Sequence, residues 1–279
     1  MVATADTPAI TASAQARPTG AAARSAFFSM LARDLTVLRK ELGMFIARTI
    51  MQPLLLLFVF TYVFQKIGQR IGGDPSEFST LLIAGVIGSA MIFQGIQAVA
   101  LPLVQDFGYT KEIEDRVLAP LPIAGVALEK VIAGALQAIL AAWVVFPLAL
   151  FVPAAKVHLH VNIFLLVTIL ILGAVMSAAL GLTIGTRVEP RQVPLIFSLL
   201  VIPMTFLGCV YYPWASLEPI KWLKIAVLIN PLVYLNEGLR AALTRVPHMN
   251  LVAVYLILIA FTAVLLQAGI KGFARRVLS

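Results

Sequence analysis

The chain has 279 residues, of which 61% are hydrophobic and 12% charged, and its mean hydropathy is +0.97. A soluble domain carries about 25% charged residues, so this composition excludes an ordinary water-soluble fold and indicates a protein that lies mostly in lipid. The formal net charge of +8 comes from basic residues scattered between apolar runs, which favours loops at an anionic membrane surface over a nucleic-acid partner.

The N-terminal region divides into a polar tail and an amphipathic stretch. Residues 1–24 are rich in Ala, Thr and Ser, and they lack the apolar run of a secretory signal, so we expect a disordered cytoplasmic tail. Residues 25–44 place apolar side chains three or four positions apart, with Arg33, Arg39 and Lys40 between them. This pattern predicts an amphipathic helix on the membrane surface. A solvent-facing extension of the first span is the alternative.

Six apolar segments follow, each near the roughly 20 residues that a helix needs to cross a bilayer. They lie at about 45–64, 79–101, 128–151, 163–185, 194–212 and 250–270. Pro194 and Pro203 in the fifth segment are tolerable where neighbouring helices satisfy the freed carbonyls. Gly181 and Gly185 form a small-xxx-small pair that lets helix backbones approach closely. The predicted fold is an all-α polytopic membrane protein, with one six-span domain over residues 45–279.

The distribution of basic residues predicts the orientation. Six spans place both termini on one side, and with the termini inside, fourteen basic residues fall in inside segments and seven in outside segments. The inside set is Arg17, Arg24, Arg33, Arg39, Lys40, Arg48, Lys111, Arg116, Lys130, Arg187, Arg191, Lys271, Arg275 and Arg276. The outside set is Lys66, Arg70, Lys156, Lys221, Lys224, Arg240 and Arg245. Under the positive-inside rule, both termini are therefore expected in the cytoplasm.

No catalytic or cofactor motif is present in the sequence. It contains no GxxxxGK[ST] phosphate loop, no GxSxG and no HExxH, so we expect no nucleotide site, no catalytic residue and no metal site. His158 and His160 are read as interfacial histidines, and Cys209 as a packing residue. Ion-coupled carriers usually keep an ionisable group at mid-membrane. The charges of Arg48, Glu129 and Lys130 instead fall near predicted cytoplasmic ends, so energy is expected to enter from a partner.

The inside loop between the second and third spans is the candidate entry point for that energy. Residues 105–122 carry six charges and end in Pro120-Leu121-Pro122, and their centre can form a short helix with Thr110 as its cap. Such a helix could dock into a cleft of a partner. A solvated loop with incidental charge is the alternative.

The segment 207–242 is too polar to span and too apolar for an exposed loop. Its aromatic residues, among them Tyr211, Tyr212 and Trp214, are typical of a membrane–water boundary. Its prolines divide it into pieces that predict two short helices, at about 216–228 and 231–243, in the outer leaflet near the exit of a pathway.

These features together resemble the permease subunits of type-2 ABC exporters. The resemblance covers about 25–275 and rests on the surface helix, the acidic run Ile113-Glu114-Asp115 before Ala119-Pro120-Leu121-Pro122, and the outer segment. In that segment, Phe206-Leu207-Gly208 and Tyr211-Tyr212-Pro213 precede Asn230-Pro231-Leu232-Val233-Tyr234 and Arg240. The long tail before Arg24 and the paired tyrosines depart from the family pattern.

Membership would imply two permeases, in our expectation a homodimer, paired with two ATPase subunits that hold the ATP and Mg, and no cofactor on this chain. It would also imply a coupling helix at about 108–120 and a re-entrant outer hairpin at about 213–243. The corresponding coupling residues are Tyr109, Lys111, Glu112, Glu114, Asp115, Arg116 and Pro120. The corresponding exit residues are Gly208, Tyr211, Tyr212, Pro213, Asn230, Pro231 and Tyr234.

The expected function is therefore export of an amphipathic or lipid-like substrate across the plasma (inner) membrane, driven by a separate ATPase. The alternative within the class is a permease for a lipid-linked glycan, although the spans hold few aromatic residues for sugar stacking. An ion-coupled carrier lacks its intramembrane charges, and a membrane enzyme lacks a nucleophile or metal cluster. A membrane scaffold would leave the charged loop and the outer segment unexplained.

Overall fold

The computed structural model describes residues 20–68, 74–110 and 121–277, and every regular element in these ranges is a helix. The N-terminal part holds α1 (Gly20–Lys40), α2 (Leu42–Leu57), the π-helical turn η1 (Phe58–Val63), α3 (Phe64–Lys66), α4 (Pro75–Gln105) and the π-helical turn η2 (Asp106–Thr110). The middle part holds α6 (Ile123–Phe151), α7 (Ile163–Gly185), η3 (Pro190–Gln192), α8 (Val193–Ile196), η4 (Phe197–Val201) and α9 (Ile202–Phe206). The C-terminal part holds η5 (Trp214–Leu217), α10 (Lys221–Ala226), η6 (Val227–Ile229), α11 (Pro231–Leu243) and α12 (Leu251–Val277).

Five helical stretches within the described ranges are long and apolar enough to cross a membrane. They are Leu42–Lys66, Pro75–Gly108, Ile123–Phe151, Ile163–Gly185 and Leu251–Val277, and they match the first four predicted segments and the sixth. The fifth predicted segment, 194–212, is different. Its apolar helix, Phe197–Phe206, is shorter than the five candidate spans. The chain leaves the helix after Leu207, and Cys209 then adopts a positive φ of 53° that no α-helix allows.

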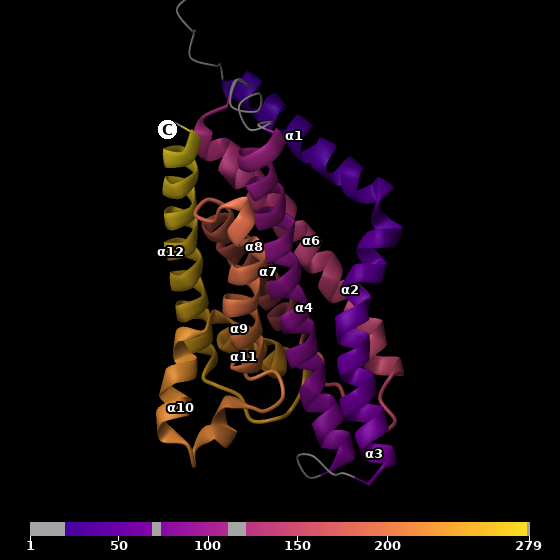
Figure 1. The fold of residues 1–279 in the computed structure, drawn as a ribbon. Helices are drawn as coiled ribbons and strands as arrows, with labels where there is room; N and C mark the ends of the chain where they lie inside the picture. The colour runs from indigo at the N-terminus through magenta and orange to yellow at the C-terminus, as the bar shows by residue number, and fades with distance from the viewer. Residues whose placement is uncertain (1–19, 69–73, 111–120, 278–279) are drawn as a thin grey trace, which may run out of the picture.

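The start of the chain is more helical than its composition predicts. Helix α1 begins at Gly20, so residues 20–24 belong to it and not to the predicted tail, whose remainder lies outside the described residues. The predicted single helix over 25–44 is divided, because the backbone of Glu41 departs from helical angles (φ −101°, ψ 13°) and α2 begins at Leu42. No residue of α1 is buried, and the helix runs obliquely from the top of the bundle to the start of α2 (Figure 1).

Helix α4 forms the centre of the bundle, and α6, α7 and α11 pack around it. Its contact with α7 is set by residues without bulky side chains. A Cβ on Gly181 would lie 2.8 Å from the backbone oxygen of Ile96, and one on Gly185 would lie 3.0 Å from Cα of Ala100. The predicted close approach at Gly181 and Gly185 is therefore confirmed. In lipid, helices associate through such close packing, since the hydrophobic effect contributes little between them.

We expect the substitution Gly181→Ala to destabilise the bundle, because the added methyl group meets backbone atoms of α4 that cannot rotate away. Overpacking of this kind costs about 1–3 kcal/mol. The matched control is Gly43→Ala, where an added Cβ meets nothing within 4 Å. Thermal unfolding in detergent should show a lower midpoint for Gly181→Ala alone. Equal midpoints for the two variants would contradict this account of the α4–α7 contact.

Candidate functional site

The segment between α9 and α12 folds back into the bundle as α11, which is buried along nearly its whole length. Asn230 begins this helix: its Oδ1 accepts a hydrogen bond from the backbone N of Leu232 at 3.0 Å, and Pro231 occupies the first turn, where its missing N–H is not needed. The Nδ2 of Asn230 donates to the backbone oxygen of Met204 at 2.7 Å. One side chain thus starts α11 and joins it to α9.

A buried ion pair lies at the centre of α11. Glu237 and Arg240 form a salt bridge, and both are fully buried. The two carboxylate oxygens of Glu237 also accept backbone N–H groups, Oε1 from Trp214 at 2.9 Å and Oε2 from Met249 at 2.7 Å. The Nη2 of Arg240 donates to the backbone oxygen of Cys209 at 2.9 Å. The pair therefore connects α11 to three loop segments that would otherwise leave polar backbone groups in an apolar bundle.

The turn at 208–210 presents its carbonyls to α11. The left-handed backbone of Cys209 is strained for a residue with a Cβ. It leaves the oxygen of Gly208 to accept from Asn236 Nδ2 at 2.6 Å, beside the Cys209 oxygen that Arg240 contacts. Helix α4 can approach this turn because it carries Gly85, where a Cβ would lie 2.2 Å from the oxygen of Val210.

The aromatic residues of the segment cover the same region. The ring of Tyr211 lies 5.3 Å from that of Phe60 and 6.1 Å from that of Phe206, centroid to centroid. Trp214 donates from Nε1 to the backbone oxygen of Lys224 at 3.0 Å, and the ammonium of Lys224 lies 4.3 Å from its ring centroid. These contacts hold the tyrosine ring and the α10 region against the end of the bundle.

A hollow of about 690 Å³ lies in front of the two tyrosines. Its lining includes Tyr211, Tyr212 and Pro213 from the outer segment, together with Ser76 and Arg245. The volume falls in the range of small-molecule sites, about 300–1,000 Å³.

The two histidines of the 156–162 loop are within hydrogen-bond distance of other polar side chains. His158 Nδ1 lies 2.9 Å from Ser76 Oγ, and His160 Nε2 lies 3.1 Å from an Arg245 nitrogen. In the described ranges, no group of three or more His, Cys, Asp and Glu could hold a metal ion.

The structure brings together the predicted exit residues and leaves the coupling residues undetermined. Gly208, Tyr211, Tyr212 and Pro213 lie in the turn beside α11, and Asn230 and Pro231 begin that helix. Tyr234 on α11 donates from its hydroxyl to the backbone oxygen of Leu228 at 2.9 Å. Tyr109 belongs to η2, whereas Lys111, Glu112, Glu114, Asp115, Arg116 and Pro120 lie outside the described residues.

Sequence reasoning gave no role to Asn236 or Glu237, and it named Arg240 only as part of the family resemblance and among the outside basic residues. The sequence signal was an acid and a base three residues apart in an otherwise apolar helix, which places them on one face where they can pair. The expectation that no ionisable group lies among the membrane helices therefore needs correction, since both residues are fully buried among them.

Comparisons with known proteins identify the relatives of this chain. A family model described as ABC-2 type transporter matches residues 25–244. The protein named "Inner membrane transport permease YadH" from Escherichia coli K12 is 27% identical over 220 residues, which is 77% of this chain and 82% of that protein. The proteins of the same name from Escherichia coli O157:H7 and Shigella flexneri match with the same identity and coverage.

We expect Glu237→Ala to destabilise the protein strongly, because it leaves the Arg240 charge and two backbone N–H groups buried without their acceptor. Breaking a buried pair from one side costs about 3–5 kcal/mol. The control is Glu218→Ala, which removes the partner of Lys224 in a pair whose carboxylate is 71% exposed, and such pairs contribute about 0–1 kcal/mol. Folded yield and thermal midpoint in detergent should fall for Glu237→Ala alone. A fall of the same size in Glu218→Ala would show that burial of the pair is unimportant.

Proposed function

Because this chain belongs to the ABC-2 type transporter family, we propose that it is the membrane-spanning subunit of an ATP-driven exporter of amphipathic or lipid-like substrates. The observation that carries the proposal is the family match over residues 25–244, which extends from α1 to the end of α11. Membrane subunits of this family are transport components without catalysis of their own, and the family implies ABC ATPase partners. We propose two such ATPases, which hold ATP and Mg, on a pair of identical permease chains.

The chain path supports six crossings with both termini on the cytoplasmic side. The start of α1 and the end of α12 lie at the same end of the bundle (Figure 1), which requires an even number of crossings. The five long helices supply five, and the helical run from α8 to α9 supplies the sixth in our proposal. The basic residues favour the cytoplasm for the end with the termini. The relatives are named inner membrane proteins, which supports the same location here.

Two further elements fit this arrangement. Helix α1 has no buried residue and carries Arg39 and Lys40 in its last turn, as a helix at an anionic membrane surface would. Helix α10 lies at the end of the bundle opposite the termini, and α11 returns from there into the bundle (Figure 1). We therefore propose that α10 and α11 form a re-entrant outer hairpin. In this arrangement, Tyr211 and Tyr212 cover the exit.

Energy would enter at the end of the bundle that carries the termini. Helix α4 ends and α6 begins there (Figure 1), so the described residues that flank the predicted coupling helix lie on the side where an ATPase would sit. We propose that the coupling helix at about 108–120 contacts the ATPase, with Glu114 as its principal acid.

A permease for a lipid-linked glycan is the second candidate. The outer hollow favours it, because Tyr211 and Tyr212 line a volume of about 690 Å³ together with polar side chains. Aromatic faces of this kind suit sugar rings. The described spans place few aromatic side chains inside the bundle, so the amphipathic substrate remains the first proposal.

The proposed orientation predicts which positions an impermeant thiol reagent can label. Cysteine at the exposed position Glu77 should react from outside intact cells, whereas cysteine at the exposed position Arg187 should react only after the membrane is opened. The native Cys209 is fully buried, so the unsubstituted chain serves as the unreactive background. Labelling of the Arg187 position in intact cells would reverse the orientation.

The proposed coupling helix predicts the effect of charge reversal at Glu114. The purified permease should hydrolyse no ATP by itself, and the ATPase should co-purify with it. Glu114→Lys should insert normally and lose either the ATPase or ATP-driven export, because a like charge at a docked contact can cost several kcal/mol.

The control for this variant is Glu189→Lys, an equal charge change at an exposed site directly after α7. It should retain both the partner and export. Normal export by Glu114→Lys with its ATPase bound would contradict the coupling role of this acid.

A further inference from the structure

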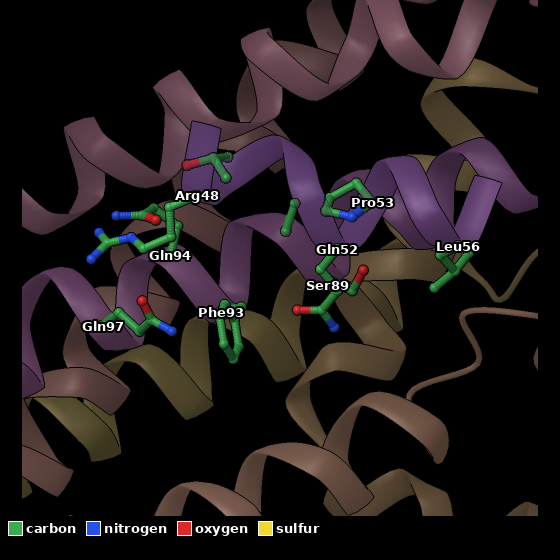
Figure 2. Close-up of a pocket in the computed structure, with 10 residues that line it drawn as sticks. Arg48, Gln52, Pro53, Leu56, Ser89, Phe93, Gln94 and Gln97 are labelled. Atoms are coloured by element: carbon green, nitrogen blue, oxygen red, sulfur yellow. The ribbon is translucent and has the colours of Figure 1, made fainter. Parts of the chain in front are cut away.

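A polar hollow lies between α2, α4 and α6, at the end of the bundle where α2 begins. Its inner part, of about 30 Å³, lies between α2 and α4 and has room for little more than water. Its outer part, of about 440 Å³, lies under the corner between α1 and α2 and reaches α6. Arg48 and Gln97 line both parts. Figure 2 shows Arg48, Gln94 and Gln97 at one end of the inner part, Gln52 and Ser89 near its middle, and Leu56 at the other end.

Polar groups in this hollow are not satisfied by the protein itself. Thr49 is 8% exposed, and its Oγ1 has no hydrogen-bond partner among the residues that the structure describes. Gln94 is 3% exposed, and its Nε2 makes only a long contact of 3.4 Å with Gln137 Oε1. A buried hydroxyl without a partner destabilises the fold, because it has lost its hydrogen bonds to water. Such a group in a helix that faces lipid indicates that something polar occupies the space beside it.

The charge of the hollow is positive where its two parts meet. Five charged side chains line the outer part: Arg33, Asp34, Glu41, Arg48 and Lys130. Asp34 forms an ion pair with Lys130, and Glu41 is exposed at the rim. Arg48 forms no ion pair with any described residue, and the lining of the inner part includes no acid. The unpaired guanidinium is therefore available to an anion from outside the chain.

Apolar residues lie beyond the polar part of the hollow. The inner part continues past Pro53 and Phe93 to Leu56, all of which are apolar. On the same helix, Met44 and Met51 are 75% and 59% exposed, so the membrane is the natural neighbour of this face. A ligand here would meet a cation, several amides and a hydroxyl at one end and hydrocarbon at the other.

We propose that the outer part of this hollow binds the acidic headgroup of an amphiphile, with Arg48 as the anion contact and Gln97 as a hydrogen-bond partner. Water in the inner part links the headgroup to Gln94 and Thr49. The hydrocarbon chain lies in the adjacent leaflet. In the orientation proposed above, this is the cytoplasmic leaflet, where an exporter takes up its substrate. The inference rests on the proposed function only in treating the occupant as transported cargo; the binding site itself is independent of it.

The direct test measures binding to the full chain in nanodiscs of zwitterionic phospholipid, with a fluorescent single-chain alkyl phosphate as the probe. The wild type should bind this probe and bind the alkyl trimethylammonium of the same chain length far more weakly. Arg48→Gln should weaken phosphate binding by about tenfold or more, since it removes a charge-assisted contact. Arg48→Lys should retain part of the affinity. Arg39→Gln, which removes the same charge from the exposed face of α1, should bind as the wild type does.

Two results would overturn the proposal. One is equal binding by Arg48→Gln and the wild type, which would reduce Arg48 to a residue that extends toward interfacial water. The other is equal affinity of the wild type for the cationic and the anionic probe. The thermal midpoint of each variant shows whether a loss of binding reflects unfolding. Thr49→Val keeps the shape of the side chain and removes its hydroxyl, so its affinity for the alkyl phosphate is a second test of the same site.

A competition experiment with acidic phospholipid distinguishes the two possible sources of the natural ligand. If acidic phospholipid added to the nanodiscs displaces the alkyl phosphate, the site takes a membrane lipid; if it does not, the site takes a single-chain amphiphile. Both results support recognition of an acidic headgroup.

A transport assay then tests the exporter role and the Arg48 site separately. It measures ATP-driven transport of the probe by the complex of the permease with its ATPase. Binding without transport would refute the exporter role and leave the site intact. Undiminished transport by Arg48→Gln would refute the site as a cargo site and leave the exporter role intact.

Discussion

The buried ion pair between Glu237 and Arg240 is the interaction on which the architecture of the outer segment depends. A bundle in lipid tolerates irregular backbone only where protein satisfies its polar groups. Glu237 accepts the N–H groups of Trp214 and Met249, and Arg240 donates to the oxygen of Cys209. Each charge is stabilised by the other and by its hydrogen bonds to backbone groups of the loops. The ion pair and the loops therefore form one structural unit.

The small residues of α4 allow that unit to lie close to the centre of the bundle. Gly85 lies against the backbone of Val210, and Gly88 lies against the side chain of Asn236. Further along the same helix, Gly95 lies against Ser177 of α7. One helix thus serves two contacts: its first half receives the outer segment, and its second half receives α7.

Polar groups are distributed unequally between the two halves of the bundle. In the outer half, the buried charges of Glu237 and Arg240 are paired with each other and hydrogen-bonded to the backbone of the loops. In the half next to α1, Arg48 has no acidic partner and the hydroxyl of Thr49 has no hydrogen-bond partner among the described residues. The first arrangement stabilises the fold, and the second is suited to binding. This difference is why the proposed substrate contact lies at Arg48 and the proposed closure lies at the outer segment.

The sequence by itself determined the helical class, the first four membrane spans and the sixth, and the position of the outer aromatic segment. These follow from local composition: runs of about 20 apolar residues must be helices in lipid, and Asn followed by Pro, as at 230–231, favours the start of a helix. The division of 25–44 at Glu41 and the end of the fifth segment at Phe206 had no such signal, because they depend on backbone turns set by packing. Only the tertiary structure decided that Glu237 and Arg240 are buried together and that Arg48 faces a polar hollow. The spacing of three residues allows Glu237 and Arg240 to pair, but the burial of the pair and the polar hollow depend on contacts between segments far apart in the chain.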